Sequence, residues 1–231
     1  MPRHARLRVA GIPFHVIQRG HNRAPCFFAE GDRAYYLDEL RRQADARDVA
    51  VHAYVLMTNH VHLLMTAADA DGIPEVMKLL GQRYVHYINR RRQRTGTLWQ
   101  GRYRSCLVDS EGYLLTCHRY IELNPVRAKM VRHPREYRWS SYRANAEGKP
   151  NMLITPHDMY QRLARSASGR QEAYHALFKA HIDDVLLDEI RNSTNGNYVL
   201  GSERFQEEIG MMLGRRVVKG KAGRPVVSRD E

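Results

Sequence analysis

Two pairs of side chains in this 231-residue sequence have the types and the spacing needed for phosphate chemistry. The first pair is His60 and His62, one residue apart in the run TNHVHLLM. Alternate side chains of a strand share a face, so these imidazoles would project together, roughly 7 Å apart, and could bind one metal ion. A histidine pair in a strand is equally compatible with hydrogen bonding or partial exposure. The histidine pair alone therefore does not establish a metal site, and a third ligand would be needed to support one.

The second pair is Tyr120 and Asn124, in the segment YLLTCHRYIELNPVRAKM. Residues four apart lie on one face of a helix, within roughly 6 Å. An amide oxygen is a suitable third ligand, and a phenol beside a metal-bound phosphate is a suitable nucleophile. Two plainer interpretations stay open, because Asn124 before Pro125 could cap a helix and Tyr120 could be a core aromatic. Tyr87 is the rival nucleophile, but Asn89 lies two residues from it and points to another side of the helix.

The basic charge is concentrated in the first part of the chain. Residues 1–150 hold 25 basic and 14 acidic side chains, whereas residues 151–231 hold 12 and 11. Between Arg83 and Arg104 there are seven Arg and no acid, interleaved with aromatic residues. Arginine binds phosphate bidentately, and cations mixed with aromatics are typical of single-strand binding, although a solvated helix face is the alternative. The predicted DNA contacts are Arg19, Asn22, Arg23, Trp99, Gln100, Arg102 and Arg104.

The elements that must position these residues follow from the apolar patterns. Together they predict an α+β fold in which helices pack on an antiparallel sheet. We expect Pro125 to end the last of these helices. The predicted elements are a strand at 13–20, a helix at 32–48, a hairpin of strands at 49–57 and 60–67, a helix at 72–91, a strand at 103–110 and a helix at 110–124.

The chain changes character after residue 148. We divide it into a catalytic domain at 1–148, a helical C-terminal extension at 149–214 and a basic, flexible tail at 215–231. The extension is nearly neutral, so an interaction or autoinhibitory role competes with DNA binding. In the tail, AGRP (222–225) is similar to hooks that insert Arg into the minor groove. Helices are predicted at 157–166, starting at a Thr155-Pro156 cap, at 170–192 and at 202–214, capped by Ser202.

Several classes of protein are disfavoured by the sequence. The three cysteines, Cys26, Cys106 and Cys117, form no CxxC pair, so neither a disulfide framework nor a cysteine zinc site is expected. Apolar runs stay far below the roughly 20 residues that span a bilayer, and the first residues lack the apolar block of a secretory signal. We therefore expect a cytoplasmic protein without a membrane partner.

Five segments together resemble a known family. RGHNRAPCFF, TNHVHLL, GTLWQGRYRS, RYIELNPVRAKMV and YRWSSY, in this order over about residues 5–145, resemble the REP-associated tyrosine transposases. These are IS200-like, single-tyrosine members of the HUH nuclease superfamily, named for a His-hydrophobic-His motif that matches His60, Val61 and His62. The family's tyrosine matches Tyr120, and its polar metal ligand matches Asn124. The resemblance implies a ferredoxin-like antiparallel sheet, with the histidines in a central strand and the tyrosine on a helix.

The resemblance also implies an activity. Such proteins are metal-dependent endonucleases and strand transferases that act on single-stranded DNA at hairpin-forming repeats. The implied catalytic residues are Tyr120, His60 and His62: the tyrosine attacks phosphorus in line, leaving a 5′-phosphotyrosine and a free 3′-hydroxyl. His60, His62 and Asn124 would hold Mg²⁺ or Mn²⁺, as in the family, with zinc as the alternative that imidazole ligands suggest.

Two other functions fit the same residues. One is a regulator that binds structured single-stranded DNA or RNA without cleaving it. The other is an unrelated metal hydrolase in which water attacks and Tyr120 is incidental. The oligomeric state is open as well. The resemblance implies dimers that exchange the tyrosine helix for the insertion-sequence relatives, but the REP-associated group looks more compatible with monomers. We therefore favour a monomer slightly over a homodimer.

Overall fold

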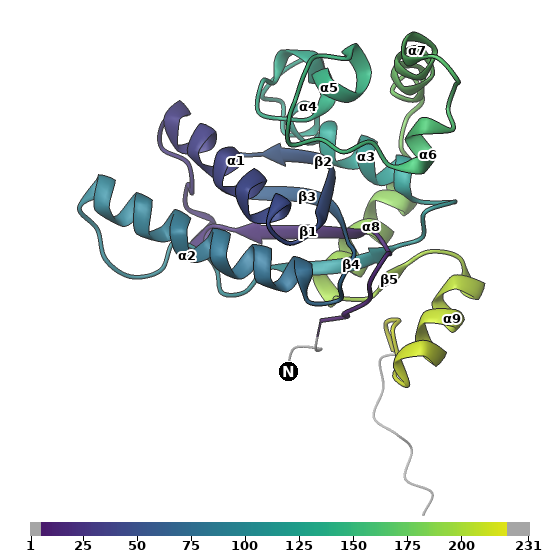
Figure 1. The fold of residues 1–231 in the computed structure, drawn as a ribbon, viewed down its shortest axis with the longest axis horizontal. Coiled ribbons are helices and arrows are strands. Elements are labelled where there is room, and N and C mark those ends of the chain that lie inside the picture. Colours follow the sequence, from purple (N-terminus) through teal and green to yellow (C-terminus); the bar gives the residue numbers. More distant parts are fainter. Residues whose placement is uncertain (1–5, 221–231) are drawn as a thin grey trace, which may run out of the picture.

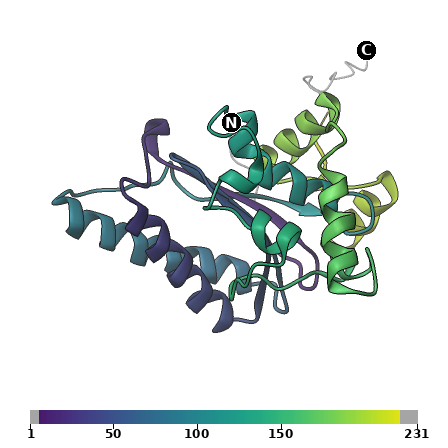
Figure 2. The same ribbon diagram turned by 90° about the horizontal axis from the view of Figure 1, so that it is seen from above.

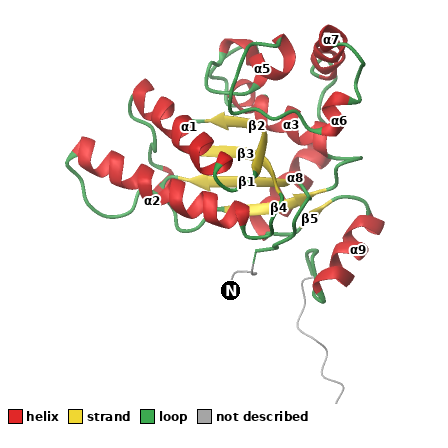
Figure 3. Cartoon of the chain, viewed as in Figure 1, coloured by secondary structure: helices red, strands yellow, loops and turns green. Residues whose placement is uncertain are grey.

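A computed structural model describes residues 6–220 of the chain. Its centre is a five-stranded sheet in the order β2-β3-β1-β4-β5, surrounded by helices (Figure 1; Figure 3). Of the predicted tail at 215–231, residues 221–231, with the AGRP segment, lie outside the described residues. No helix within residues 6–220 is both long and apolar enough to cross a membrane. The strands are β1 (Phe14–Arg19), β2 (Val49–Leu56), β3 (His60–Ala67), β4 (Arg104–Val108) and β5 (Val199–Leu200).

The first four strands form the antiparallel sheet expected from the sequence. β1 pairs with both β3 and β4, and β2 pairs with β3, which gives the ferredoxin-like order. β2 and β3 are apolar runs joined by a tight connection at Thr58 and Asn59, as a hairpin requires. The α+β prediction is therefore confirmed. β5, which the sequence did not predict, adds a parallel edge strand next to β4.

Two long helices cover one face of the sheet: α1 (Glu30–Asp45) and α2 (Gly72–Arg92) (Figure 2). Both present an apolar stripe to the sheet, where Tyr36 and Leu40 of α1 meet Tyr84 of α2 in the core. This core also takes one set of alternating strand residues. The other set, including the two histidines of β3, faces the opposite side.

The opposite face is covered by α3 (Leu114–Glu122) and by α8 (Asp184–Gly196). The predicted helix at 110–124 is thus real but shorter. It stops at Leu123, and the short helix α4 (Asn124–Arg127) begins there with Pro125 in its first turn. Pro125 therefore starts a helix instead of ending one, because a proline needs no helical hydrogen-bond acceptor in the first turn.

The C-terminal extension is helical, but its helices differ from the prediction. The expected helix at 170–192 is divided, because the Asp183 side chain accepts a hydrogen bond from the Val185 backbone N–H and starts a new helix. At the first helix the cap is His157, not Thr155. The predicted Ser202 cap does accept from the Phe205 N–H. The remaining helices are η1 (His21–Arg23), η2 (Pro134–Glu136), α5 (Tyr142–Glu147), α6 (Asp158–Gln161), α7 (Ala167–Leu177) and α9 (Glu203–Leu213).

A buried carboxyl group ties the extension to the tyrosine-bearing helix. Glu122 at the end of α3 accepts hydrogen bonds from the side chains of Ser141, Asn145 and Tyr174. Burial raises the pKa of Glu122 to about 7, although the three hydrogen bonds act to lower it. Tyr174 belongs to α7, so this network joins two segments that are far apart in the sequence. It fixes the end of α3 beside the place where Tyr120 emerges.

We expect Tyr174→Phe to lower the free energy of unfolding by about 1–3 kcal/mol, because it removes one hydroxyl and leaves a buried carboxyl with one partner fewer. Urea denaturation followed by circular dichroism measures this change. The control is Tyr35→Phe. Tyr35 is a half-buried residue of α1 whose ring stacks on Tyr87, and its substitution should change the free energy of unfolding by less than about 0.5 kcal/mol. Equal stability of the two variants would contradict the network's structural role.

Candidate active site

The sheet register places three histidines on one face. In the β1–β3 pairing Arg19 lies opposite His60, and Ile17 lies opposite His62. Alternation along β1 brings His15 to the same face. Its imidazole stacks on that of His62 with ring centres 5.0 Å apart, and the His60 ring lies 5.1 Å from His62. A cluster of imidazoles is thus built from two central, neighbouring strands.

Each predicted histidine ligand has its Nδ1 atom occupied. His62 Nδ1 hydrogen-bonds His15 Nε2 at 2.8 Å, and His60 Nδ1 hydrogen-bonds Asn59 Oδ1 at 2.7 Å. The described residues offer no hydrogen-bond partner to either Nε2 atom, and both histidines line the same cavity. Partners of this kind fix the orientation and tautomer of metal-binding imidazoles. The geometry therefore leaves two Nε2 lone pairs available on one side of the sheet.

The tyrosine and the asparagine reach the same place from α3 and α4. The Tyr120 ring lies 5.7 Å from that of His62 and 5.5 Å from that of His15. Asn124 donates its amide N–H to the backbone carbonyls of Tyr120 and Ile121. This leaves the amide oxygen of Asn124 as the atom free to act as a ligand. The helix boundary at Leu123 thus keeps the two side chains together, although they belong to two helices.

A cavity of about 330 Å³ contains all four predicted catalytic and metal-binding residues. Its wall also includes residues from α8, in the C-terminal extension. The Thr194 hydroxyl and His15 Nδ1 are hydrogen-bonded at 2.9 Å, and the Arg191 cation lines the same cavity and acts to lower the pKa of the Tyr120 phenol. The centre is therefore assembled from β1, β3, α3, α4 and α8. Besides the four predicted residues, the polar lining consists of His15, Arg19, Arg127, Arg191, Thr194 and Asn195.

The electrostatics keep the imidazoles neutral. Burial and then Arg19 lower the pKa of His60 to about 4, while burial and then Arg127 lower that of His15 to about 3. The pKa of His62 is also far below its usual value, chiefly through burial. Neutral imidazole is the form that binds metal ions. No group of three His, Cys, Asp or Glu suited to a metal occurs within residues 6–220.

Burial has the opposite effect on the phenol. It raises the pKa of Tyr120, whose side chain is only 6 % exposed. Arg127 and then Arg191 counteract the shift, since a positive charge favours the phenolate. The Arg127 guanidinium lies 4.3 Å from the centre of the Tyr120 ring and bonds the Tyr120 carbonyl. Two cations thus flank the proposed nucleophile.

Four of the predicted DNA contacts lie together. Arg19, Gln100, Arg102 and Arg104 line one small concavity beside the catalytic cavity, and Arg19 lines both. The Gln100 backbone N–H bonds the Arg19 carbonyl at 2.8 Å, which joins the two segments. Asn22 and Arg23 are exposed on η1, both with positive φ. DNA contacts remain a prediction for all six residues.

The aromatic residues of this region lie elsewhere. Trp99 is 5 % exposed and packs against Tyr36 and Tyr84 in the core, so its ring face is not available for base stacking. Tyr87, the rival nucleophile, lies on α2 at the other face of the sheet. It stacks on Tyr35 and donates its hydroxyl to Asp32. The histidine cluster therefore faces Tyr120 and not Tyr87.

Sequence reasoning missed His15, Arg127, Arg191 and Thr194. The first has a readable signal, because alternation in FHVIQR puts His15 on the face of Arg19. Arg127 lies within the same segment as Tyr120. Arg191 and Thr194 carry no local signal, because their position depends on how the extension folds back onto the sheet.

Comparison with known proteins decides the family. A model described as "Transposase IS200 like" matches residues 8–124, which is just over half of the chain. This chain belongs to the IS200-like transposase family. As a member, it is an HUH-type single-strand DNA nuclease. The match ends at Asn124, so α8 and its contribution to the cavity lie outside the part that defines the family.

One solved structure supports this fold, and a second was also matched. The first is described as a REP-associated tyrosine transposase bound to a REP hairpin. It matches with a TM-score of 0.56 at 15 % sequence identity, and the match covers 68 % of this IS200-like chain and 93 % of the solved chain. A second is a candidate transposase from Deinococcus radiodurans, at 24 % identity and a TM-score of 0.37, covering 52 % and 96 %. Curated proteins gave no match. At these identities the first structure supports the fold, and the second adds no argument.

Proposed function

We propose that this transposase cuts and rejoins single-stranded DNA at hairpin-forming repeats through a covalent 5′-phosphotyrosine on Tyr120. The observation that carries the proposal is the convergence of Tyr120, His60, His62 and Asn124 on one cavity from separate segments of the chain. The structure bound to a REP hairpin supports a folded DNA substrate for a protein of the same fold.

Tyr120 is the nucleophile in this proposal. Its oxygen attacks the scissile phosphorus in line, and the P–O bond to the 3′ oxygen of the leaving strand breaks. The phenolic proton passes to solvent, and the leaving 3′ oxygen takes up a proton to become a free 3′-hydroxyl. Arg127 and Arg191 favour the phenolate and offer guanidinium donors to the phosphate oxygens. A later attack by a 3′-hydroxyl returns the phosphate to DNA and frees the tyrosine, so no external energy source is needed.

The residues present fit a divalent metal ion. Two Nε2 lone pairs, of His60 and His62, and one amide oxygen, of Asn124, are left without other partners in the cavity. Mg²⁺ or Mn²⁺ held there would supply Lewis-acid polarisation of the scissile phosphate. Zinc is the alternative for a site with two imidazoles. His15 and Asn59 orient the two imidazoles from behind.

The decisive experiment is a denaturing gel of the full-length protein incubated with Mn²⁺ and a labelled hairpin oligonucleotide that has unpaired flanks. We expect a labelled band that migrates with the protein and withstands denaturation. Binding without cleavage would assign the chain to the non-cleaving regulators instead. Cleavage without a covalent band would favour water as the nucleophile.

We expect His15→Phe to raise the Mn²⁺ concentration needed for half-maximal cleavage by about 10- to 100-fold, since it removes the group that orients His62. Phenylalanine keeps a buried ring of similar size. His52→Phe is the matched control, because His52 is a buried histidine of β2 that bonds Thr66 and the Thr155 carbonyl outside the cavity. An unchanged metal requirement in His15→Phe would contradict the orienting role.

We expect Arg191→Gln to slow cleavage by about 10²-fold, because a cation beside both the phenol and the phosphate is lost. Single-turnover cleavage rates measure the effect. Arg204→Gln in α9 is the control, since Arg204 also pairs with an acid on its own helix but is not among the residues that line the cavity. Equal rates in both variants would remove α8 from the catalytic centre.

A further inference from the structure

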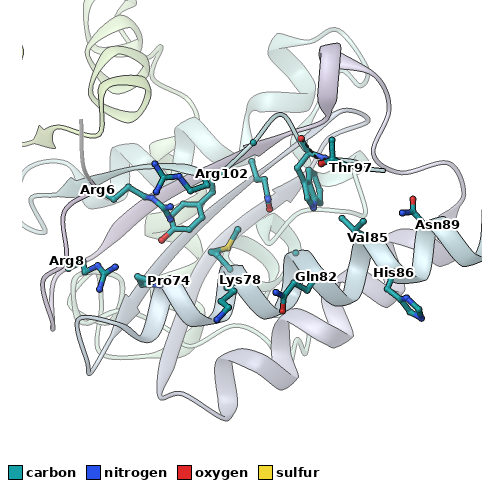
Figure 4. A pocket seen from close by; sticks show the side chains of 16 residues that line it. Arg6, Arg8, Pro74, Lys78, Gln82, Val85, His86, Asn89, Thr97 and Arg102 are labelled. Carbon is teal, nitrogen blue, oxygen red and sulfur yellow. Dashed lines mark hydrogen bonds between the residues drawn. The ribbon is translucent and has the colours of Figure 1, made fainter. Parts of the chain in front are cut away.

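His15 lines the catalytic cavity, yet both of its ring nitrogens are already bonded within the protein. Alternation along β1 sends Gln18 to a separate groove of about 1100 Å³ between α2 and the segment at 97–103 (Figure 4), whereas His15 faces the catalytic side. There its Nδ1 atom bonds the Thr194 hydroxyl at 2.9 Å, and its Nε2 atom bonds His62 Nδ1 at 2.8 Å. Because neither nitrogen is left for a metal ion or a phosphate, His15 acts as a link between Thr194 and His62.

The Thr194 hydroxyl sets the direction of the hydrogen bonds in this link. It bonds the Ile190 carbonyl, one turn earlier in α8, at 2.7 Å. A carbonyl can only accept, so the single hydroxyl proton of Thr194 is used in that bond, and the hydroxyl must accept from His15. The Cys106 thiol, 3.2 Å away, can donate to the second lone pair of the same hydroxyl. The ring proton of His15 is therefore placed on Nδ1.

The His15 ring passes this direction on to His62. His15 is 1 % exposed, and no Asp or Glu is among the described residues that line the cavity, so a charged imidazolium would be buried without a compensating partner. A neutral imidazole with its proton on Nδ1 presents a lone pair at Nε2. His62 Nδ1 must then be the donor in the bond between the two rings. This leaves the free lone pair of His62 on Nε2, the atom proposed to bind the metal ion.

His60 is oriented by a shorter chain of the same kind. Its Nδ1 atom bonds Asn59 Oδ1 at 2.7 Å, and the Asn59 amide N–H donates to the Arg23 carbonyl at 2.8 Å. The second bond requires the amide nitrogen of Asn59, so the amide oxygen faces His60 and accepts from its Nδ1. Both chains end on a backbone carbonyl. Two unrelated segments thus place the proton of each ligand on Nδ1 and leave Nε2 bare, as a metal ion shared by the two imidazoles requires.

The position of Thr194 depends on how α8 is attached to β4. Arg104 donates to Asn195 Oδ1 at 2.8 Å, and the Ser105 backbone N–H donates to Asn197 Oδ1 at 3.1 Å. Asn197 ends α8 with a φ of 57°, a left-handed conformation that asparagine adopts more readily than most residues. These bonds hold the last turn of α8 against the sheet. The link to His62 therefore begins in the C-terminal extension, beyond the residues that the family model matches.

We propose that Thr194 is a positioning residue of the metal site: acting through His15, it holds His62 in the tautomer whose Nε2 lone pair is free for the ion. The inference rests on the proposed function for the role of His62 as a ligand. It adds that the C-terminal extension sets the chemical state of the centre. Without the hydroxyl, the Nδ1–H of His15 has no acceptor. His15 then gains by carrying its proton on Nε2, and this forces the His62 proton onto the metal-binding atom.

The test determines the tautomers in the metal-free, full-length protein. Nitrogen-15 NMR with labelled histidine distinguishes a protonated ring nitrogen from a bare one, and the spectrum of His62→Ala identifies the His62 signals. Thr194→Val removes the hydroxyl at similar volume, and Thr194→Ser keeps it. Thr66→Val is the matched control, because the Thr66 hydroxyl bonds Nε2 of the buried His52 at 2.9 Å and neither residue lines the cavity. Electron paramagnetic resonance of free Mn²⁺ measures the affinity of each variant for the ion.

We expect His15 and His62 of the wild-type protein to carry their protons on Nδ1. Thr194→Val should move the His62 proton to Nε2 in a substantial fraction of molecules and raise the dissociation constant for Mn²⁺ by about tenfold or more. Thr194→Ser should match the wild-type protein in both measurements. Thr66→Val should change neither, although it takes an equivalent hydroxyl from a buried histidine. The two wild-type tautomers decide the result if Thr194→Val does not fold.

A wild-type His62 with its proton on Nε2 would overturn the proposal, and so would an unchanged His62 tautomer in a folded Thr194→Val. Equal changes in Thr194→Val and Thr194→Ser, or in Thr194→Val and Thr66→Val, would also overturn it, because they would show an effect of packing instead of the hydroxyl. Failure of the proposed function is seen separately, as the absence of a covalent band with the wild-type chain, a result on which the tautomers of the metal-free protein do not depend.

Discussion

Tyr120→Phe should abolish the covalent protein–DNA band and lower the rate of strand cleavage by about 10⁴-fold or more. The variant removes a single oxygen, the one that would attack phosphorus, and leaves the ring between His15, His62 and Arg127. The reason for so large an effect is that no other hydroxyl of the described residues lines the cavity except that of Thr194, which is bonded to His15. Single-turnover assays with a labelled hairpin measure it.

Two controls make this result specific. Tyr113→Phe, just before α3, alters a half-buried tyrosine of the same segment and should leave cleavage unchanged. Tyr120→Phe should bind the hairpin as tightly as the wild-type protein, because the contacts proposed for binding lie elsewhere. Cleavage that persists in Tyr120→Phe would show that water or another residue attacks, and would end the phosphotyrosine proposal.

His62→Ala should lower cleavage by about 10³-fold or more, since a bound Lewis acid contributes several kcal/mol to such reactions. The change removes a proposed ligand and also leaves His15 Nε2, deeply buried, without its partner. Chelation with EDTA should inactivate the wild-type protein to a similar degree. Added Mn²⁺ should restore the wild-type protein but not His62→Ala.

His175→Ala is the matched control for this variant, because His175 is exposed on α7 and does not line the cavity. Circular dichroism checks that His62→Ala still folds. Cleavage by the wild-type protein that continues undiminished in EDTA would contradict the metal proposal, even if Tyr120 proved essential.

The sheet could be predicted because its strands are short apolar runs with clear ends. The runs VAVHAYVLM and HVHLLMTA are apolar, and nearly all of their side chains are buried. They flank a two-residue connection, so the local sequence is sufficient to predict the hairpin. The expected grouping of Tyr120 with the histidines came from the family resemblance. Their common cavity depends on α3 packing across the sheet, which periodicity alone does not establish.

The features that the sequence did not predict have physical causes. The break between α7 and α8 depends on one cap, at Asp183, inside a pattern that otherwise reads as one helix. β5 has only two residues, too few for a recognisable pattern. Arg191 reaches Tyr120 only because α8 folds back against β4, a contact between residues separated by more than seventy positions. Long-range packing of this kind leaves no trace in a short window of sequence.

The attachment of α3 to the extension bears on how many chains one centre needs. Tyr174 donates a hydrogen bond to Glu122 at the end of α3, and Arg191 lines the cavity beside Tyr120, both from the same chain. Moving α3 to a neighbouring molecule would break the bond to Tyr174 and separate Tyr120 from Arg191. We infer that each molecule works as a self-sufficient unit, so its turnover per molecule should not fall on dilution.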